Sequence, residues 1–439
     1  SQIALLSATS VCVMLAIGIY RCKWAVLEEA IIDNIRASAS AIIILLLIGA
    51  IAGSWMVSGV VPTMIYYGLK ILHPSFFLVA SCAICAGVSL MTGSSWTTIA
   101  TIGVALMGIG QAMGFPEGWI AGAIISGAYF GDKISLLSDT TVLASSTVGV
   151  PIFTHIRYML YTTVPSFVIA LAVFVIAGLT LDHTGGTHAG MYAESLRGTF
   201  RITPWLLAVP VATGVLIVRK LPAIVTLFCA AVFACIAMLL AQPELVAKVA
   251  GVGGLDFMSG FKGVLMSCFG PTAIPTGSPQ LDELVATRGM AGMLNTVWLI
   301  ICAMCFGGVM TGSGMLRSLT ELFLRFVHRA FSAVASTVGA GIFFNLCTAD
   351  QYISIILSGR LFRELYAERG LEPRLLSRSV EDSATVCSVL IPWNSCGMTQ
   401  ATVLGVSTFV YMPYCIFNIA SPIMSLLVAA TLKKVKSKK

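Results

Sequence analysis

The chain has 439 residues, of which 57% are apolar and only 10% are charged, and its mean hydropathy is +0.94. Soluble domains place about a quarter of their residues in charge, and a globule this poor in charge would expose too much apolar surface to water. The composition therefore excludes a soluble enzyme, a disordered chain and a nucleic-acid-binding module. It indicates a protein surrounded by lipid.

Charged residues are absent from several long runs of the chain. A helix that crosses a bilayer needs about 20 apolar residues, and each run is long enough, or nearly long enough, for one crossing. The longer runs contain Gly, Pro, Ser and Thr near their middles, so we expect turns inside the membrane and several broken spans. The uncharged runs are residues 1–20, 37–69, 71–116, 158–181, 202–218, 289–316 and 383–432.

Short motifs of the first half of the chain recur in the second half at a nearly constant offset of 254 to 256 positions. Such self-similarity predicts an internal duplication, which is common in the two halves of secondary transporters. The matched segments are 51–56 with 305–310, 92–96 with 347–351, 138–140 with 393–395, and 149–150 with 405–406.

We therefore predict an all-α polytopic membrane protein built from two inverted-topology repeats, 1–180 and 203–439, joined by an external loop at 181–202. Each repeat is expected to carry one re-entrant hairpin and one broken transmembrane helix. The hairpins are expected at 75–113 and 331–366, and the broken helices at 119–149 and 379–403. The other expected spans are 1–20, 40–62, 152–178, 203–219, 222–241, 291–313 and 408–431.

The orientation of the repeats follows from the number of crossings and from the basic residues. Repeat 2 makes an odd number of crossings, so the repeats enter the membrane in opposite directions. The counterpart of span 203–219 would precede Ser1, so we expect the first span of repeat 1 to be missing. If the lysine-rich tail is placed in the cytoplasm, most of the Lys and Arg residues in the loops also fall on the cytoplasmic side of the membrane. This placement also opens hairpin 75–113 to the outside and hairpin 331–366 to the cytoplasm.

Polar residues at membrane depth are the candidate functional residues, because each is costly there unless it has a partner or faces water. They fall at the two hairpin tips and at the two helix breaks. Hydroxyls, freed carbonyls and carboxylates are hard oxygen ligands for a cation such as sodium, and a carboxylate binds either the cation or a proton. The candidates are Ser94, Ser95, Thr97, Asp132, Ser135, Ser138, Asp139, Thr140, Thr141, Asp350, Gln351, Asp382, Asn394 and Ser395.

Structural interpretations compete with some of these assignments. Asp132 and Lys133 are neighbours in sequence and would neutralise one another at a helix end. Glu381 and Asp382 would instead cap the helix that follows Arg378. An enzyme is not indicated, because no nucleophile has a base and an orienting acid at recognisable spacing. A channel remains an alternative, since polar loops at depth also form ion filters.

Four segments, 92–110, 122–165, 345–362 and 377–397, resemble the NhaC family of sodium/proton antiporters, most specifically around GDKISLLSDTT. The resemblance covers nearly the whole chain and implies the ion transporter superfamily fold, with a scaffold domain and a transport domain. It also implies a homodimer in the bacterial inner membrane, with sodium ions and protons as coupling ions and no other cofactor. The implied cation site is Ser94, Ser95, Ser138, Asp139 and Thr140, with Asp350 and Asn394 from the other half.

The chain departs from the family pattern at one position, where Leu136 or Leu137 replaces an expected proline. The family also includes members that exchange malate for lactate with sodium and protons, so an organic-anion exchanger acting on small carboxylates is the alternative function. The carboxylate-rich site favours cation exchange. The resulting hypothesis is an antiporter in which Asp132 and Asp139 alternate between sodium and protons by alternating access.

Overall fold

The computed structural model describes residues 2–181, 187–219, 221–254, 256–276, 282, 285–316, 323 and 330–431. Within these residues the chain is helical, and one isolated bridge pairs Thr272 with Thr287. Six of the described helices are long and apolar enough to cross a membrane, or up to nine if each bent pair is one span. The prediction of an all-α protein with several broken spans is confirmed.

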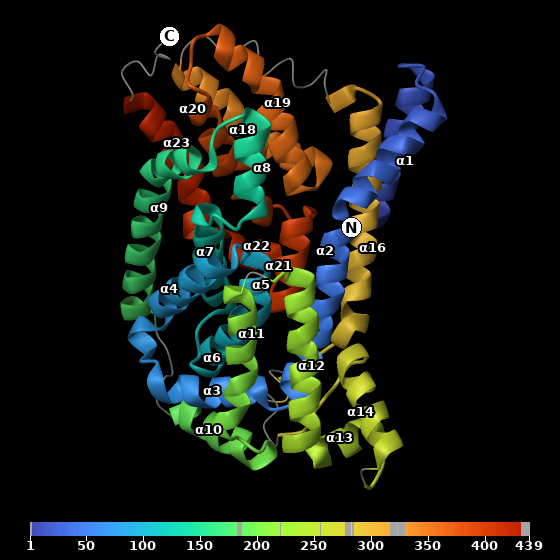
Figure 1. The fold of residues 1–439 in the computed structure, drawn as a ribbon, viewed down its shortest axis with the longest axis vertical. Helices are drawn as coiled ribbons and strands as arrows, with labels where there is room; N and C mark the ends of the chain where they lie inside the picture. The colour runs from blue at the N-terminus through green and yellow to red at the C-terminus, as the bar shows by residue number, and fades with distance from the viewer. Residues whose placement is uncertain are drawn as a thin grey trace.

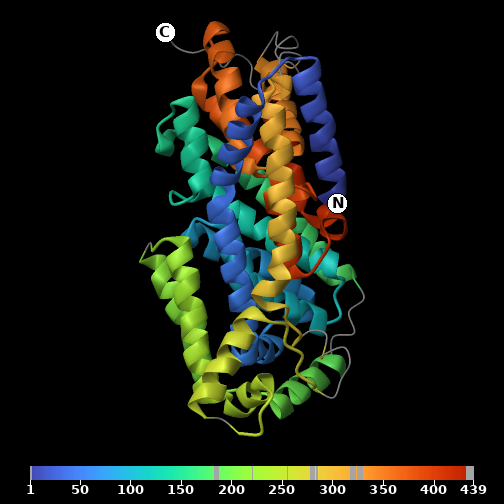
Figure 2. The same cartoon turned by 90° about the vertical axis from the view of Figure 1, so that its right-hand side faces the viewer.

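Two long helices that are distant in sequence form the side of the molecule that faces the viewer in Figure 2. The 34-residue α2 (Trp24–Val57) lies along α16 (Gly289–Gly312). Gly308 allows this approach, because a Cβ there would meet the Ile31 backbone at 2.7 Å. Asn34 Nδ2 donates to the Met304 carbonyl at 3.4 Å. The pair contacts α1 (Gln2–Gly18), α12 (Ala223–Ala241) and α14 (Phe257–Phe269), while α11 (Ala208–Val218) packs against α12 and α13 (Pro243–Ala250) packs against α14.

Both expected hairpins are present. Hairpin 1 consists of α4 (Pro74–Thr92), α5 (Ser95–Thr98), a π-helical turn (Ile99–Gly103) and α6 (Val104–Ala112). Hairpin 2 consists of α18 (Ala330–Thr348) and α19 (Gln351–Glu368). Figure 1 shows α18 and α19 toward the end that carries the C label and α6 toward the opposite end, so the hairpins enter from opposite sides.

Both expected broken helices are also present. The first consists of α7 (Glu117–Ile134) and α8 (Asp139–Val148), bent by 46° at residues 135–138, here called break 1. The second consists of α20 (Pro373–Val380), a π-helical turn (Glu381–Thr385), a short 3₁₀ turn (Ser388–Leu390) and α21 (Ser395–Leu404), interrupted at residues 391–394, here called break 2. In Figure 1 the first runs toward the C-labelled end and the second away from it, as inverted repeats require.

Two further spans flank the broken helices. Helix α9 (Ile152–Thr180) packs against α23 (Ile416–Thr431), which a 3₁₀ turn at Met412–Tyr414 joins to the short α22 (Thr408–Tyr411). The α22–α23 pair is bent by 55°. The ring of Phe130 on α7 stacks on that of Phe167 on α9 at 3.7 Å between centroids. These contacts join the first broken helix to α9.

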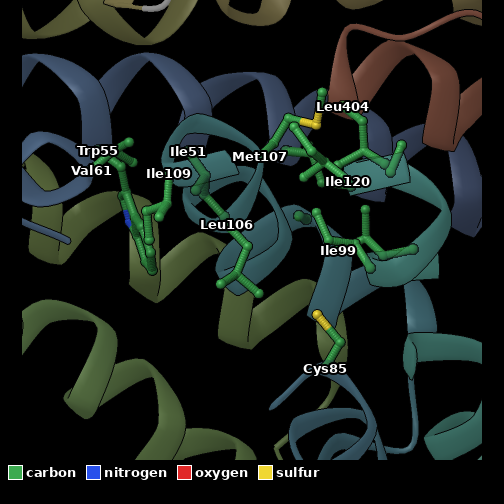
Figure 3. Close-up of a cluster of buried hydrophobic side chains, with 14 of the residues drawn as sticks. Ile51, Trp55, Val61, Cys85, Ile99, Leu106, Met107, Ile109, Ile120 and Leu404 are labelled. Carbon is green, nitrogen blue, oxygen red and sulfur yellow. The ribbon is translucent and has the colours of Figure 1, made fainter. Parts of the chain in front are cut away.

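An apolar core joins hairpin 1 to its surroundings. Figure 3 shows Ile51 and Trp55 of α2, Leu106 and Met107 of α6, and Leu404 of α21 gathered in one cluster of buried side chains. The Trp55 indole also donates to the Ala230 carbonyl of α12 at 3.2 Å. Hairpin 1 therefore packs against elements from both halves of the sequence.

The structure differs from the expected boundaries in several places. Helix α2 begins at Trp24 rather than at residue 40, and α3 (Val60–Ile71) follows it after Gly59, whose φ of +80° suits glycine. The expected loop at 181–202 contains α10 (Thr187–Thr199). Helices α13 and α14 were not expected, since each is too short to give a span signal. The lysine-rich tail lies outside the described residues.

The close approach of α4 and α7 gives the first test. A Cβ at Gly127 would lie 2.0 Å from the Cys82 carbonyl oxygen, whereas one at Gly87 of α4 would meet nothing within 4 Å. We expect Gly127→Ala to destabilise the protein by about 1–3 kcal/mol through overpacking, measured by thermal unfolding in detergent. Gly87→Ala is the control, because it gains the same helix propensity without the clash. Equal effects of the two changes would contradict this packing.

Candidate functional site

Four helices begin inside the molecule, at the two hairpin tips and at the two breaks, and each is capped by its own preceding side chain. Ser94 accepts the Thr97 N–H at 3.2 Å, and Ser138 accepts the Thr141 N–H at 3.5 Å. Asp350 accepts the Tyr352 N–H at 2.9 Å, and Asn394 accepts the Cys396 N–H at 3.1 Å. Ser, Asp and Asn are preferred here because their oxygens satisfy backbone donors that a helix start leaves free.

Hydrogen bonds to Asp132 of α7 join the tip of hairpin 1 (tip 1, residues 92–97) to the first broken helix. The N–H and Oγ of Ser95 both donate to Asp132 Oδ2, at 3.0 and 2.7 Å. Gly93, with a φ of +67°, lies so close to break 1 that a Cβ would meet the Leu137 carbonyl carbon at 2.6 Å. Ser138 and Thr140 share a hydroxyl hydrogen bond of 2.9 Å at the same break. Ser95 and Asp132 are 37 residues apart in sequence, and their hydrogen bonds join tip 1 and the first broken helix into one structural unit.

Hairpin tip 2 and break 2 repeat this arrangement. Ser395 Oγ donates to Asp350 Oδ2 at 3.2 Å, and the Ser395 N–H donates to the Ala349 carbonyl at 2.8 Å. Asn394 Nδ2 donates to the Asn345 side-chain oxygen at 3.2 Å. Ala349 has a φ of +58°, a strained conformation for a residue with a Cβ. Strain of this kind persists only where surrounding contacts hold it, as they do here.

A cavity of about 660 Å³ lies where tip 1, tip 2 and break 1 meet α2 and the α11–α12 turn; we call it the carboxylate cavity. Three carboxylates line it, those of Asp132, Asp139 and Asp350. Among the described residues that line it there is no Lys, Arg or His. Its other polar residues are Ser38, Ser40, Thr92, Ser94, Thr97, Thr140, Thr226, Gln351 and Tyr352. The cavity therefore has a negative lining rich in oxygen.

Some of the predicted site residues line the carboxylate cavity, and others stabilise the hairpin tips and helix breaks around it. Asp132 is only 8% exposed, whereas Asp139 is exposed to the cavity. Ser135 donates to the Leu90 carbonyl at 2.9 Å, and Thr141 donates to the Lys133 carbonyl at 3.0 Å, so both stabilise break 1. The break persists without the proline expected at Leu136 or Leu137. The predicted residues outside the cavity lining are Ser95, Ser135, Ser138, Thr141, Asp382, Asn394 and Ser395.

Comparison with known proteins identifies the family. The model of the Na+/H+ antiporter family matches residues 127–431. The Na(+)/H(+) antiporter NhaC of Alkalihalophilus pseudofirmus is 36% identical over 420 residues, which are 95% of this chain and 88% of that protein. This chain belongs to the Na+/H+ antiporter family. It is a secondary transporter rather than an enzyme, and the sequence-based recognition of an NhaC-type protein is confirmed.

Other members of the family differ in the substrates that their names state. The malate-2H(+)/Na(+)-lactate antiporter of Bacillus subtilis is 35% identical over 393 residues, 88% of this chain and 80% of that protein. The arginine/ornithine antiporter ArcD of Halobacterium salinarum is 34% identical over 413 residues, 93% of this chain and 82% of that protein.

Two solved structures cover most of this antiporter-family chain with low overall similarity. MtrF of Neisseria gonorrhoeae has a TM-score of 0.42 and 14% identity, and the match covers 92% of this chain and 84% of MtrF. The YdaH transporter of Alcanivorax borkumensis has a TM-score of 0.40 and 12% identity, with 93% and 89% covered.

Behind the carboxylate cavity this antiporter-family protein holds a second group of charges, here called the buried ion cluster. Lys133 Nζ donates to Asp382 Oδ1 and, at 2.8 Å, to Ser421 Oγ. Asp382 Oδ1 also accepts the Thr162 hydroxyl at 3.0 Å, and Arg378 Nε lies 3.7 Å from Asp382 Oδ2. The side chains of Lys133, Arg378 and Asp382 are fully buried.

The buried ion cluster corrects two interpretations made from the sequence. Lys133 pairs with Asp382 of the other half, not with its neighbour Asp132, which bonds to Ser95. Glu381 and Asp382 do not cap a helix, because they lie in a π-helical turn that continues α20. Asp382, predicted as a cation ligand, lines no part of the carboxylate cavity and neutralises buried cations instead.

Sequence reasoning missed several polar residues around the site. Ser38 lines the carboxylate cavity from α2, and Thr226 lines it from α12. Thr226 is a small polar residue in an otherwise apolar helix, which was the available signal, whereas Ser38 follows the charged part of α2 that contains Asp33 and Arg36. Glu381 was not among the predicted site residues, because a helix cap was an equally good interpretation of a carboxylate at that position.

The buried ion cluster gives a stability test for this antiporter-family protein. Asp382→Asn removes the anion that faces two buried cations, so we expect a loss of about 3–5 kcal/mol of unfolding free energy. Thermal unfolding in detergent measures it. Asp33→Asn is the control, because Asp33 and its partner Arg36 have side chains 60% and 76% exposed and such pairs contribute only about 0–1 kcal/mol. Equal shifts for both variants would contradict the assignment.

Proposed function

We propose that this protein exchanges sodium ions for protons across the membrane by alternating access, with the cation bound in the carboxylate cavity. The observation that carries the proposal is the lining itself, in which Asp132, Asp139 and Asp350 from both halves surround one space. Unpaired carboxylates at membrane depth attract cations or protons and mark ion pathways. The family of the chain supports the same coupling ions.

The chemistry of the proposed site suits sodium. The free N–H groups at the N-termini of α5, α8, α19 and α21 carry partial positive charge, and side-chain oxygens already cap these N-termini. The remaining negative charge of the cavity is therefore available to a cation. The proposed sodium ligands that line the cavity are Ser94, Asp132, Asp139 and Thr140, while Ser95 and Ser138, which the sequence also suggested, hold tip 1 and break 1 beside it. A proton and a sodium ion compete for the same carboxylate oxygens, which couples their binding in opposite directions.

Alternating access is supported by a second cavity of about 920 Å³ on the other side of hairpin 1. It contacts α2 at Ala52 and Met56, whereas the carboxylate cavity contacts α2 at residues 37–44. At a rise of about 1.5 Å per residue, these positions differ in height by several helical turns. Hairpin 1 separates the cavities and would expose the site to each in turn. We further propose a homodimer whose C-terminus is cytoplasmic.

A transporter of organic ions is the second candidate, because the carboxylate cavity exceeds the volume that one sodium ion needs. The names of two relatives state exchange of malate for lactate and of arginine for ornithine. A malate or lactate carboxylate would meet three carboxylates and no basic side chain among the described lining residues, which is unfavourable. A cationic amino acid would not meet this repulsion. Transport assays need both substrate classes.

The deciding experiment measures proton flux in proteoliposomes with an internal pH dye. Sodium or potassium is first added alone, and malate with lactate, or arginine with ornithine, is then placed on opposite sides of the membrane. We expect a pH change with sodium alone, with no organic ion present. A response that requires malate and lactate, or arginine and ornithine, would overturn the proposal in favour of an organic-ion exchanger.

The same assay tests the site. Asp132→Asn removes one charged ligand, so we expect the apparent sodium affinity to fall at least about tenfold, since contacts to a charged group contribute about 1.5–3 kcal/mol. Asp139→Asn is expected to act in the same direction and to abolish exchange. Asp33→Asn is the control because Asp33 does not line the cavity and its side chain is 60% exposed. Wild-type exchange by both Asp132→Asn and Asp139→Asn would reject this site.

A further inference from the structure

A separate cavity of about 750 Å³, here called the basic pocket, lies at the end of the molecule opposite the C label of Figure 1. Helices α10, α13 and α14 and the segments 200–202 and 271–275 contribute its lining. Its volume falls within the range of ligand-binding pockets, about 300–1,000 Å³. Among the described residues, none lines both this pocket and the carboxylate cavity.

Hydrogen bonds hold the walls of the basic pocket. The side chain of Gln242, at the start of α13, accepts the Arg201 N–H at 3.2 Å and donates to the Arg201 carbonyl at 3.2 Å. Thr272 exchanges two backbone hydrogen bonds with Thr287, of 2.8 and 2.9 Å, and so holds the segment 271–275. The pocket is therefore a defined feature of the fold rather than a gap between unconnected loops.

The lining of the basic pocket is positively charged. Arg197, Arg201 and Lys248 line it, and Glu244 is the one acidic residue in the described lining, which gives a formal charge of +2. Arg201 lies 3.1 Å from Glu244, but their side chains are 62% and 79% exposed, and such pairs are weak. Neither Arg197 nor Lys248 has an acidic partner among the described residues. The basic groups are thus available to an anion.

Basic residues are concentrated at this pocket. The segments 181–202 and 242–288 contain five Lys and Arg residues, which are Arg197, Arg201, Lys248, Lys262 and Arg288. Three of the five line the basic pocket. In the orientation proposed above this end faces away from the cytoplasm, where membrane proteins carry few basic residues. Their presence around one cavity therefore indicates a role in binding.

An exposed apolar face of α14 adjoins the basic pocket. Phe257, Phe261, Leu265 and Phe269 recur at intervals of four residues and are 51–87% exposed. Met266, on the same helix, lines the pocket and is also exposed. Large apolar residues outside and small residues inside are the reverse of a helix in water and suit contact with lipid chains. The buried residues of α14 are Ser259, Gly260, Gly263 and Ser267.

We propose that the basic pocket binds the phosphate of an anionic phospholipid whose acyl chains lie along the apolar face of α14. Arginine and lysine donate charge-assisted hydrogen bonds to phosphate oxygens, and Met266 makes the apolar face continuous with the pocket. A water-soluble phosphate would use only the charges. The bound lipid joins α10, which packs against α3 and α6, to α13 and α14, which pack against α12 and α2.

The test follows thermal unfolding of the purified full-length protein in a nonionic detergent while lipid is added at constant sodium concentration. Phosphatidylglycerol should raise the unfolding temperature with increasing concentration, because a ligand that binds the folded protein stabilises it. Phosphatidylcholine, which has no net charge, should not. The double variant Arg197→Gln, Lys248→Gln should bind phosphatidylglycerol at least about tenfold more weakly, since contacts to a charged phosphate are lost.

Lys248→Gln and Lys262→Gln form a matched pair. Each removes one positive charge from an exposed lysine on adjacent helices, but only Lys248 lines the basic pocket. Lys248→Gln should weaken the binding of phosphatidylglycerol, and Lys262→Gln should bind as wild type. Equal weakening by both would overturn the proposal, because general attraction to the surface would then explain binding. Lys248→Arg keeps the charge and should bind as wild type. Weak binding by Lys248→Arg would contradict the role given to this charge.

Inorganic phosphate and glycerol 3-phosphate present the anion without acyl chains. At the concentrations used for phosphatidylglycerol, they should leave the unfolding temperature of the wild type unchanged. An equal rise with either would overturn the lipid assignment in favour of a water-soluble anion. If phosphatidylglycerol raises the wild-type unfolding temperature no more than phosphatidylcholine does, the basic pocket is not an anionic-lipid site. The assay involves no transport, so neither result bears on the exchange activity.

Discussion

The structure depends on satisfying backbone groups where helices start inside the membrane. No water is available in lipid to bond the free N–H groups of a helix start, so irregular backbone survives at that depth only when protein satisfies it. Ser94, Ser138, Asp350 and Asn394 do so from the position just before each half-helix. These caps hold the two hairpin tips and the two breaks in place, and the carboxylate cavity lies between them.

The charged side chains on the two sides of α7 are neutralised in different ways. Toward the carboxylate cavity the charges are uncompensated carboxylates, which a mobile cation or proton can neutralise. Toward α9 and α23 they are paired, with Lys133 bonded to Asp382 and Ser421. A charge is costly in this environment without a partner, so the paired side provides stability, and the unpaired side is where we propose that ions bind.

Much of the fold was predictable because polar residues are costly inside long apolar runs unless the chain turns there or encloses a polar site. Hairpin tips were expected at residues 92–97 and 348–350, and the structure turns at Gly93 and Ala349. Helices α10, α13 and α14 were not predicted, since they are short and give no span signal. The partner of Lys133 could not be predicted either, because 249 residues separate it from Asp382 and adjacent opposite charges suggested the simpler pairing with Asp132.

The sequence by itself determined that this protein spans a membrane, where its helices break and which polar residues lie at the breaks. Those properties follow from hydropathy and from the conformational preferences of Gly, Ser, Asp and Asn, which are local. Only the tertiary structure decided which carboxylates share a cavity and which pair with buried cations. Adjacent residues of a helix point in different directions, so the register of α7 against hairpin 1 and the buried ion cluster assigned Asp132 to the cavity and Lys133 to the interior.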